Sequence, residues 1–306
     1  MREQVHVFAP GSVGNLGPGL DILGLAIGGL GDAVRARRTA GRGIVVEEAG
    51  DPSLPTDPSR HASAIAAHAV LRAAGADFGL ALRLEKGLPL SGGQGGSASS
   101  AVAGAVAANL LLDQPLPVEA LLLAALESET VLSGRHADNI APILLGGLVL
   151  IRSLDPLDVL RLPVPEGLLV VLAHPDRKLN TRDGRAALPR EVSRDTALHQ
   201  AAQVAAIVAA AYSGDLALLG RSIDDRIAEP ARAPLLDGFL AAKRAALAAG
   251  ALGCSISGSG PTAFAIVGSE RQGEAVGAAM RRAYTEAEVS ATIRVAAPDL
   301  IGARAL

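Results

Sequence analysis

The residues most able to do chemistry lie in a glycine-rich stretch between Leu88 and Leu112, LPLSGGQGGSASSAVAGAVAANLLL. Leucines alternating at positions 80, 82 and 84 predict a strand before it, and the alanine-rich, proline-free run 98–112 predicts a helix after it. Glycines let the backbone approach a ligand closely, and a helix start exposes unpaired N–H groups at the positive end of its dipole. These features together predict an anion site suited to phosphate. A tight turn with a serine N-cap would produce the same composition.

Two other phosphate-binding patterns fit this stretch poorly. The P-loop pattern ends in Gly-Lys-Ser/Thr, and the stretch contains no lysine. The dinucleotide-binding pattern is matched loosely by Gly93-x-Gly95-x-x-Ala98, but the downstream acid, Asp113, lies at a predicted helix end and not at the end of a second strand. What remains is Pro-x-x-x-Gly-x-Gly-x-Ser-Ala, which begins at Pro89.

Length and composition indicate one large or two medium globular domains. The chain has 306 residues, of which 49% are hydrophobic and 19% charged, and its net charge is -3. This charge and an aromatic fraction of 2% give no reason to expect nucleic acid or a membrane surface as partner. No run of apolar residues is long enough to predict a membrane span. The single cysteine, Cys254, cannot form an internal disulfide, and it predicts a small buried side chain in a reducing, cytoplasmic setting.

The first half of the chain predicts a mainly antiparallel sheet with helices between its strands. Strands are expected at 5–9, 23–27, 33–37, 44–47, 80–84 and 146–151, and helices at 57–74, 98–112 and 117–130. The segment Pro10 to Asp21 is too rich in glycine for regular structure, yet it carries Asn15. Asx turns, in which Asn15 and Asp21 hydrogen-bond their own backbone, would account for both of these side chains.

The second half begins where prolines punctuate the chain. Because of Asp155-Pro156 and Pro163-Val-Pro165, we place a domain boundary that divides the chain into 1–155 and 156–306. Strands are expected at 168–173, 263–267 and 292–296, helices at 195–212, 216–228, 235–249 and 271–283, and a second glycine-rich loop at 253–262. Residues 229–232 should break the second of these helices. This order is compatible with a ferredoxin-like α+β layer.

Carboxylates and a polar cluster precede the boundary. Glu127 and Glu129 are two residues apart on a predicted helix, so they point to different faces and at most one of them faces a site. The polar cluster 133–142 contains His136 and Asn139.

Three separated segments together resemble one family, the homoserine kinases of the GHMP kinase superfamily. Asn15-Leu-Gly-Pro-Gly-Leu-Asp21 is similar to its first motif, Pro89 to Ala98 to its second, and Ser257-Gly-Ser-Gly-Pro-Thr262 to its third. Three shorter segments also resemble homoserine kinases: His136-x-Asp138-Asn139-x-Ala-Pro142, Thr181-x-x-x-Arg185 and Glu229-Pro230-x-Arg232. The resemblance spans residues 5 to 267 in a consistent order.

The resemblance implies an α+β fold of two domains. These are an N-terminal ATP-binding domain like domain 2 of ribosomal protein S5 and a C-terminal ferredoxin-like domain. The implied activity is Mg²⁺- and ATP-dependent phosphorylation of the L-homoserine hydroxyl to O-phospho-L-homoserine, in threonine biosynthesis, and a homodimer is a fair expectation. The alternatives are another GHMP small-molecule kinase and a non-catalytic nucleotide-binding regulator on the same fold. The metal ligands implied at Ser97 and Glu129 argue against the regulator. The pair Arg185 and Arg232 argues against a neutral sugar as substrate, because such a sugar has no carboxylate.

Site residues follow from the resemblance and agree with the chemistry of the ligands. Arginine forks match a carboxylate, whereas an ammonium group needs a carboxylate and amide acceptors. The resemblance therefore assigns homoserine to Asn15, Asp21, His136, Asn139, Arg185 and Arg232, with the two arginines on its carboxylate. It assigns Mg²⁺ to the hard oxygen ligands of Ser97 and Glu129, and it places Thr181 near the transferred phosphate. The residues implied to bind ATP are Pro89, Leu90, Ser91, Gly92, Gly93, Gln94, Gly95, Gly96, Ser97, Ala98 and Ser99.

Two departures from the family pattern affect the nucleotide end. The first serine of the usual Gly-Leu-Gly-Ser-Ser-Ala is Gly96 here, which removes one hydroxyl donor. His61 stands where the family often has an asparagine facing adenine, so purine selectivity stays open. The general base stays open as well, because homoserine kinases have no obvious one.

Overall fold

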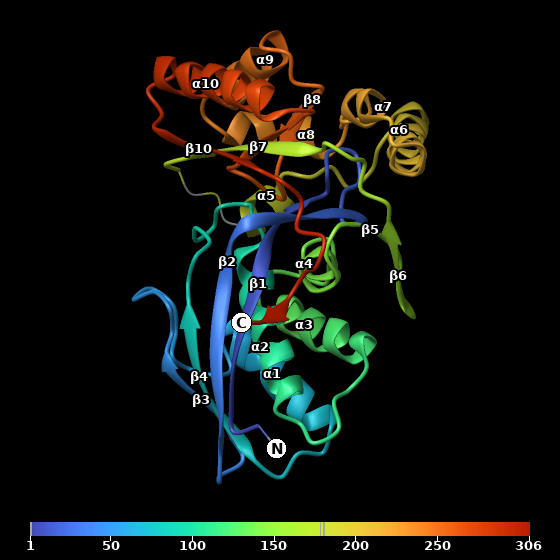
Figure 1. The fold of residues 1–306 in the computed structure, drawn as a ribbon. Coiled ribbons are helices and arrows are strands. Elements are labelled where there is room, and N and C mark those ends of the chain that lie inside the picture. Colours follow the sequence, from blue (N-terminus) through green and yellow to red (C-terminus); the bar gives the residue numbers. More distant parts are fainter. Residues whose placement is uncertain (1, 178, 180) are drawn as a thin grey trace.

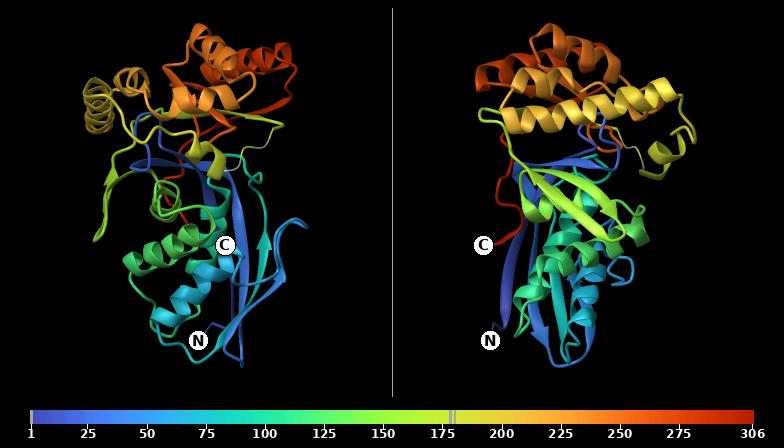
Figure 2. Two further views of the ribbon diagram at one scale, coloured as in Figure 1. Left: turned by 180° about the vertical axis from the view of Figure 1, so that it is seen from behind. Right: turned by 90° about the vertical axis from the view of Figure 1, so that its right-hand side faces the viewer.

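Two sheets organise the chain, one above the other in Figure 1. The computed structural model describes residues 2–177, 179 and 181–306, except for the side chain of Thr181. In the lower half, α1–α4 stack on one side of the long strands β1 and β2, and Figure 2 shows the same layering from two further sides. Helices and strands are mixed in both halves, which confirms the predicted α+β class. No helix in the described part of the chain is long and apolar enough to cross a membrane.

The first sheet is mixed but mainly antiparallel. Its strands are β1 (Gln4–Gly14), β2 (Leu23–Thr39), β3 (Gly43–Glu48), β4 (Gly79–Glu85), β5 (Leu148–Leu154), β6 (Leu157–Leu162) and β11 (Arg304–Ala305). They run in the order β11-β1-β2-β4-β3, with β5 paired to β2 and β6 to β5, and β3 is parallel to β4. The predicted boundary after residue 155 stays a prediction, and the pairing of β6 keeps residues 157–162 with this first sheet.

Small residues allow the helices on this sheet to pack closely. The helices are α1 (Ala62–Ala73), α2 (Gly96–Leu110), α3 (Val118–Leu132) and α4 (Ile140–Leu145). Most of α2 is buried, and a Cβ atom at its Gly104 would lie only 2.2 Å from the backbone oxygen of Ser63 on α1. Alanine and glycine therefore bring α1 and α2 into direct backbone contact, which explains a core with so few aromatic residues.

The second sheet has the strand order of a ferredoxin-like layer. Its strands are β7 (Leu169–Pro175), β8 (Gly253–Ile256), β9 (Ala263–Val267) and β10 (Ala291–Ala296), in the order β10-β7-β9-β8 with antiparallel neighbours. The helices of this half are α5 (Thr181–Ala186), α6 (Arg194–Ser213), α7 (Leu216–Arg221), α8 (Ala228–Arg232), α9 (Phe239–Ala248) and α10 (Glu270–Glu286), with a 3-10 turn at Ala233–Leu235. In chain order the strands lie 4-1-3-2, so the predicted topology is confirmed.

Two strands are longer than the sequence predicts. β1 continues through the glycine-rich residues 10–14, and β2 is a single strand where two were expected. The register of this pair shifts at a bulge between Pro10 and Gly11. Gly14 and Gly24 have no room for a side chain, because Asp138 from a distant part of the sequence packs against them. A Cβ atom at Gly14 would lie 2.4 Å from a carboxylate oxygen of Asp138, and one at Gly24 only 1.8 Å from the Asp138 carbonyl oxygen. The polar cluster thus packs directly on the strand backbone.

The predicted start of the first helix is wrong. α1 begins at Ala62 and not at Asp57-Pro58. The Asp57 carboxylate instead accepts hydrogen bonds from the backbone N–H and the hydroxyl of Ser59, which closes a local turn.

The predicted helix break at residues 229–232 is also wrong, because these residues are part of α8. The Asp225 carboxylate accepts hydrogen bonds from the N–H groups of Ile227, Ala228 and Glu229, and so caps the new helix. Pro230 lies in the first turn, where a backbone donor is not needed.

The next helix and the second glycine-rich loop are shorter than predicted. α9 begins at Phe239 and not at Leu235, because Gly238 adopts a left-handed conformation with φ of 76°. Residues 253–256 form β8 and not part of a loop.

The lone cysteine should be chemically inert in the folded protein. Cys254 lies on β8 with 1% of its surface exposed, and burial raises the pKa of its thiol to about 12. Because the thiolate is the reactive form, we expect negligible reaction with a disulfide reagent such as DTNB at pH 8, and reaction of one thiol per chain in guanidinium chloride. Rapid labelling of the native protein would contradict the burial of this side chain.

Candidate active site

A cavity of about 1020 Å³ lies where the two halves of the molecule meet. Its walls come from the glycine-rich loop (residues 89–99), the end of α3, the polar cluster 133–139 and, from the second half, α5, α8 and the loop after β8. The predicted site residues that line it are Asn15, Asp21, Pro89, Leu90, Ser91, Gly92, Gly93, Gly95, Gly96, Ser97, Ala98, Glu129, His136, Asn139, Arg185 and Arg232. Segments that lie far apart in the sequence, from both halves of the chain, therefore meet at one cavity.

Two of the predicted residues, Gln94 and Ser99, do not line this cavity. Gln94 is buried and its amide turns toward Thr262 and Arg294. The hydroxyl of Ser99 donates to the carbonyl oxygen of Ala9 on β1, 2.8 Å away. Thr181 begins α5, but its side chain lies outside the described part of the chain.

The start of α2 is open for an anion. Gly95 takes the N-cap position in a left-handed conformation with φ of 72°, and no side chain caps the helix. The first N–H groups of α2 are therefore left for a ligand, at the positive end of a helix of 15 residues. This geometry supplies the anion site that the sequence predicts.

Side chains of the second glycine-rich loop hold the first loop from behind. The hydroxyl of Ser257 donates to the Gly93 carbonyl at 2.6 Å, and that of Thr262 donates to the Gly92 carbonyl. His174 lies 2.9 Å from the same Thr262 oxygen. The carbonyls of the loop thus face protein, which leaves its other side to the cavity.

A buried carboxylate, not predicted as part of the site, ties the two ends of the loop together. Asp32 is fully buried, and one of its oxygens accepts hydrogen bonds from the N–H groups of Gly87 and Leu88 at 3.1 Å. Its other oxygen binds the Lys86 ammonium and the Ser100 hydroxyl. The sequence gives no hint of this arrangement, because Asp32 on β2 and Lys86, which follows β4, are 54 residues apart.

Ser97 and Glu129 form a pair of oxygen ligands beside the open helix start. The Ser97 hydroxyl lies 2.8 Å from one carboxylate oxygen and 3.1 Å from the other, and Ser133 also donates to this carboxylate. Glu129 is 3% exposed, whereas Glu127 pairs with Arg72 on the surface. The expectation that only one of the two glutamates faces a site is therefore confirmed.

This donor set fits Mg²⁺ bound together with phosphate. Mg²⁺ prefers oxygen ligands and usually combines one or two carboxylates with water and substrate phosphates. Within the described residues, no group of three or more His, Cys, Asp or Glu side chains forms a self-sufficient metal site. A hydroxyl and a carboxylate next to an anion-binding helix start are what a phosphate-dependent metal site requires.

Two arginines also line the cavity. The guanidinium of Arg185 donates to both carboxylate oxygens of Asp21, at 2.7 and 3.0 Å, and this contact raises the pKa of Arg185. Arg232 is 3% exposed and donates to the carbonyls of Gly184 and Gly258, both at 2.9 Å. Burial lowers the pKa of Arg232, which therefore gains from an additional negative ligand.

Buried polar atoms without partners face the same region. His136 and Asp138 are both buried, with Nδ1 and a carboxylate oxygen 3.4 Å apart. Burial opposes protonation of the imidazole, but the neighbouring Asp138 carboxylate outweighs it and raises the pKa of His136. Nδ1 and that carboxylate oxygen have only each other, at a distance longer than an ordinary hydrogen bond, and Nε2 has no hydrogen-bond partner among the described residues. Such atoms mark a place where a polar ligand group would be satisfied.

Two other predicted residues are already engaged by protein atoms. Asn15 donates through Nδ2 to the Gly258 carbonyl at 3.0 Å and accepts at Oδ1 from the Asp21 N–H at 3.0 Å. His61 lies 2.9 Å from the Ser63 hydroxyl through one ring nitrogen and 3.3 Å from the Ala49 carbonyl through the other. His61 lines the cavity, yet both of its ring nitrogens have hydrogen-bond partners, so it offers no free hydrogen-bonding atom to an adenine ring.

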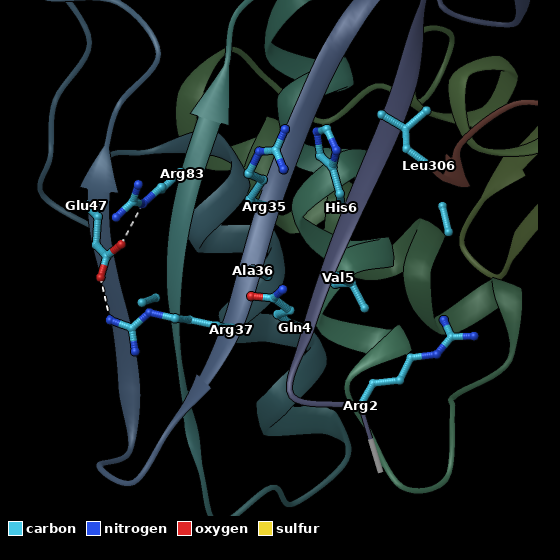
Figure 3. Close-up of a pocket in the computed structure, with 12 residues that line it drawn as sticks. Arg2, Gln4, Val5, His6, Arg35, Ala36, Arg37, Glu47, Arg83 and Leu306 are labelled. Atoms are coloured by element: carbon cyan, nitrogen blue, oxygen red, sulfur yellow. Dashed lines mark hydrogen bonds and ion pairs between the residues drawn. The ribbon is translucent and has the colours of Figure 1, made fainter.

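A second cavity, of about 560 Å³, lies on the outer face of the first sheet (Figure 3). Three of its four arginines pair with carboxylates: Arg37 and Arg83 both point to Glu47, at 2.5 and 2.8 Å, and Arg35 binds Glu85. Exposed ion pairs of this kind are typical of a solvated sheet face.

Comparison with known proteins gives a consistent picture. The model for the GHMP kinases N terminal domain matches residues 61–147, and that for the GHMP kinases C terminal matches residues 207–286. The homoserine kinase of Arabidopsis thaliana is 46% identical over 98% of this chain and 84% of its own length. That of Chlorobium phaeobacteroides strain DSM 266 is 43% identical over 92% of each chain. The crystal structure of homoserine kinase from Cytophaga hutchinsonii is 39% identical and superimposes with a TM-score of 0.95, covering 100% of this chain and 98% of that one.

Removal of the Asp32 carboxylate should destabilise the protein strongly. Asp32→Ala leaves the buried Lys86 ammonium without its counter-ion, so the free energy of unfolding should fall by about 3–5 kcal/mol. The measurement is urea denaturation followed by circular dichroism. Glu127→Ala is the control, because it removes one partner of an exposed pair and should cost less than about 1 kcal/mol. Equally small losses in both variants would show that the loop does not depend on Asp32.

Proposed function

The chain belongs to the homoserine kinase family of the GHMP kinases, and on this premise we propose that it transfers the terminal phosphoryl group of ATP to the hydroxyl of L-homoserine. The products are ADP and O-phospho-L-homoserine. One observation carries the proposal beyond family membership: a single cavity is lined both by an uncapped helix start and by a cluster of arginines and carboxylates. The helix start suits a triphosphate, and the cluster suits both charges of an amino acid.

The glycine-rich loop and the start of α2 would bind the triphosphate through backbone N–H groups. Ser97 and Glu129 would hold Mg²⁺, whose charge would neutralise phosphate oxygens as negative charge shifts toward the leaving group. Lys86, which lines the cavity and is held by Asp32, adds a fixed positive charge near the same helix start.

Homoserine would bind with its carboxylate toward Arg185 and Arg232 and its ammonium toward Asp21. Arg185 and Asp21 form an ion pair with each other, so each charged end of the substrate would replace one half of that pair. His136 and Asn15 would lie near the amino end, and Asn139 would lie beside the hydroxyl. This arrangement would leave no charged group of the substrate unpaired.

Phosphoryl transfer of this kind depends mainly on positioning and on neutralisation of charge. The two substrates would meet in one cavity, which turns a bimolecular step into one between held partners. Because little bond formation to the attacking oxygen is needed early in a loose transition state, we assign no general base. Thr181 stays in the proposal as a residue near the transferred phosphate.

A coupled assay tests the proposed function directly. ADP formation, followed through pyruvate kinase and lactate dehydrogenase, should require both L-homoserine and Mg²⁺ and should stop when either is omitted. Turnover with mevalonate or galactose in place of homoserine would move the chain to another branch of the GHMP kinases. Calorimetric binding of ATP and homoserine without turnover would identify a non-catalytic binder.

Loss of the Arg185 guanidinium should affect homoserine and leave ATP unchanged. Arg185→Leu removes charge-assisted hydrogen bonds to the substrate carboxylate, so KM for homoserine should rise about 10- to 200-fold, while KM for ATP stays within about twofold. Steady-state kinetics in both substrates measure this. Arg190→Leu, at an exposed position beyond the same helix, is the matched control and should leave both KM values unchanged. An unaltered KM for homoserine in Arg185→Leu would remove Arg185 from the binding site.

A further inference from the structure

Ser12 is a buried polar residue in contact with a side chain that lines the cavity. It lies on β1 with 2% of its surface exposed. Its hydroxyl donates a hydrogen bond to Oδ1 of Asn139, 2.8 Å away and 127 residues further along the chain. A buried hydroxyl that binds a side chain lining the cavity is able to control how that side chain faces a ligand.

The place of Ser12 beneath the cavity is tightly constrained. Its backbone N–H donates to the carbonyl of Gln94 at 3.1 Å, which joins β1 to the glycine-rich loop. A Cβ atom at Gly95 would lie 2.3 Å from the Ser12 hydroxyl oxygen and 3.2 Å from Oδ1 of Asn139. The hydroxyl is thus enclosed between the start of α2 and the Asn139 amide, with room for little movement of either.

Asn139 makes this contact in place of a helix-capping hydrogen bond. It occupies the N-cap position of α4, where asparagine commonly caps the helix through its side chain, but it makes no capping hydrogen bond. Its amide turns to Ser12 instead. With Oδ1 engaged, the Nδ2 group has no hydrogen-bond partner among the described residues, and Asn139 lines the cavity.

We propose that Ser12 is a positioning residue that fixes the amide of Asn139 so that it presents N–H donors, and not its carbonyl oxygen, to the reacting groups. This inference rests on the proposed function and deepens it. The oxygens of the transferred phosphoryl group and the attacking hydroxyl oxygen all accept hydrogen bonds, and negative charge shifts among them in the transition state. A donor held in place stabilises that charge, whereas an amide turned the other way would repel it.

A double-mutant cycle tests this role. Ser12→Ala should lower kcat about 3- to 10-fold, the effect of one neutral hydrogen bond, while KM for ATP and homoserine stays within about twofold. Because Ser12 acts through Asn139, the same substitution should have no further effect on kcat in an Asn139→Ala background. Asn139→Asp should have a lower kcat than Asn139→Ala, because it places an acceptor where the proposal requires a donor.

Controls separate positioning from folding. Ser222→Ala removes another buried hydroxyl, which donates to the Leu218 carbonyl and does not line the cavity, and it should leave kcat unchanged. Melting temperatures measured for all variants should show a similar loss for Ser12→Ala and Ser222→Ala. Multiplicative losses of kcat in the double variant, a loss confined to KM, or an Asn139→Asp variant more active than Asn139→Ala would each overturn the role of Ser12. A wild-type chain that transfers no phosphoryl group would overturn the proposed function as well, so the two failures are distinguishable.

Discussion

Hydrogen bonds to the carbonyl groups of the glycine-rich loop are the constraint on which the rest of the site depends. A loop so rich in glycine loses much conformational entropy when it is ordered, and a ligand alone would have to supply that free energy. Here Ser257 and Thr262 donate to the carbonyls of Gly93 and Gly92, and the N–H of Ser12 donates to that of Gln94. The loop is therefore ordered before a ligand arrives, and its N–H groups are left for the phosphate.

The same contacts join the two halves of the molecule. Two of the donors come from the loop after β8, so the shape of the anion site depends on the second sheet as well as on α2. Gly93 permits the close approach, since a Cβ atom there would lie 2.5 Å from the Ser257 carbonyl oxygen. Arg232 extends the connection, because it binds both Gly184 on α5 and Gly258 in that loop. The wall that would bind the amino acid and the wall that would bind the nucleotide therefore both contact the loop after β8.

Local chemistry could be predicted from the sequence, whereas contacts between distant segments could not. The uncapped start of α2 follows from its glycines, and the separation of Glu127 from Glu129 follows from helix geometry alone. Asp32 and Ser12 were missed because their partners lie on other elements, and neither stands in a recognisable pattern. The extent of β1 was missed for the same reason. Its glycines suggested a loop, but Gly14 is needed within the strand because the Asp138 side chain, from a distant segment, packs against it.

Charge balance explains why the amino-acid end of the cavity is stable without a ligand. Asp21 forms an ion pair with Arg185, and Asp138 lies 3.4 Å from His136 and raises its pKa, so neither carboxylate is left isolated. An amino acid is itself a pair of opposite charges. When it binds, the Asp21–Arg185 ion pair would be replaced by two new pairs, one between Asp21 and the ammonium and one between Arg185 and the carboxylate. Binding therefore adds no net charge to a partly buried site. A substrate with only one charged end would leave either Asp21 or Arg185 without a partner, and the cost of that unpaired charge favours a zwitterion.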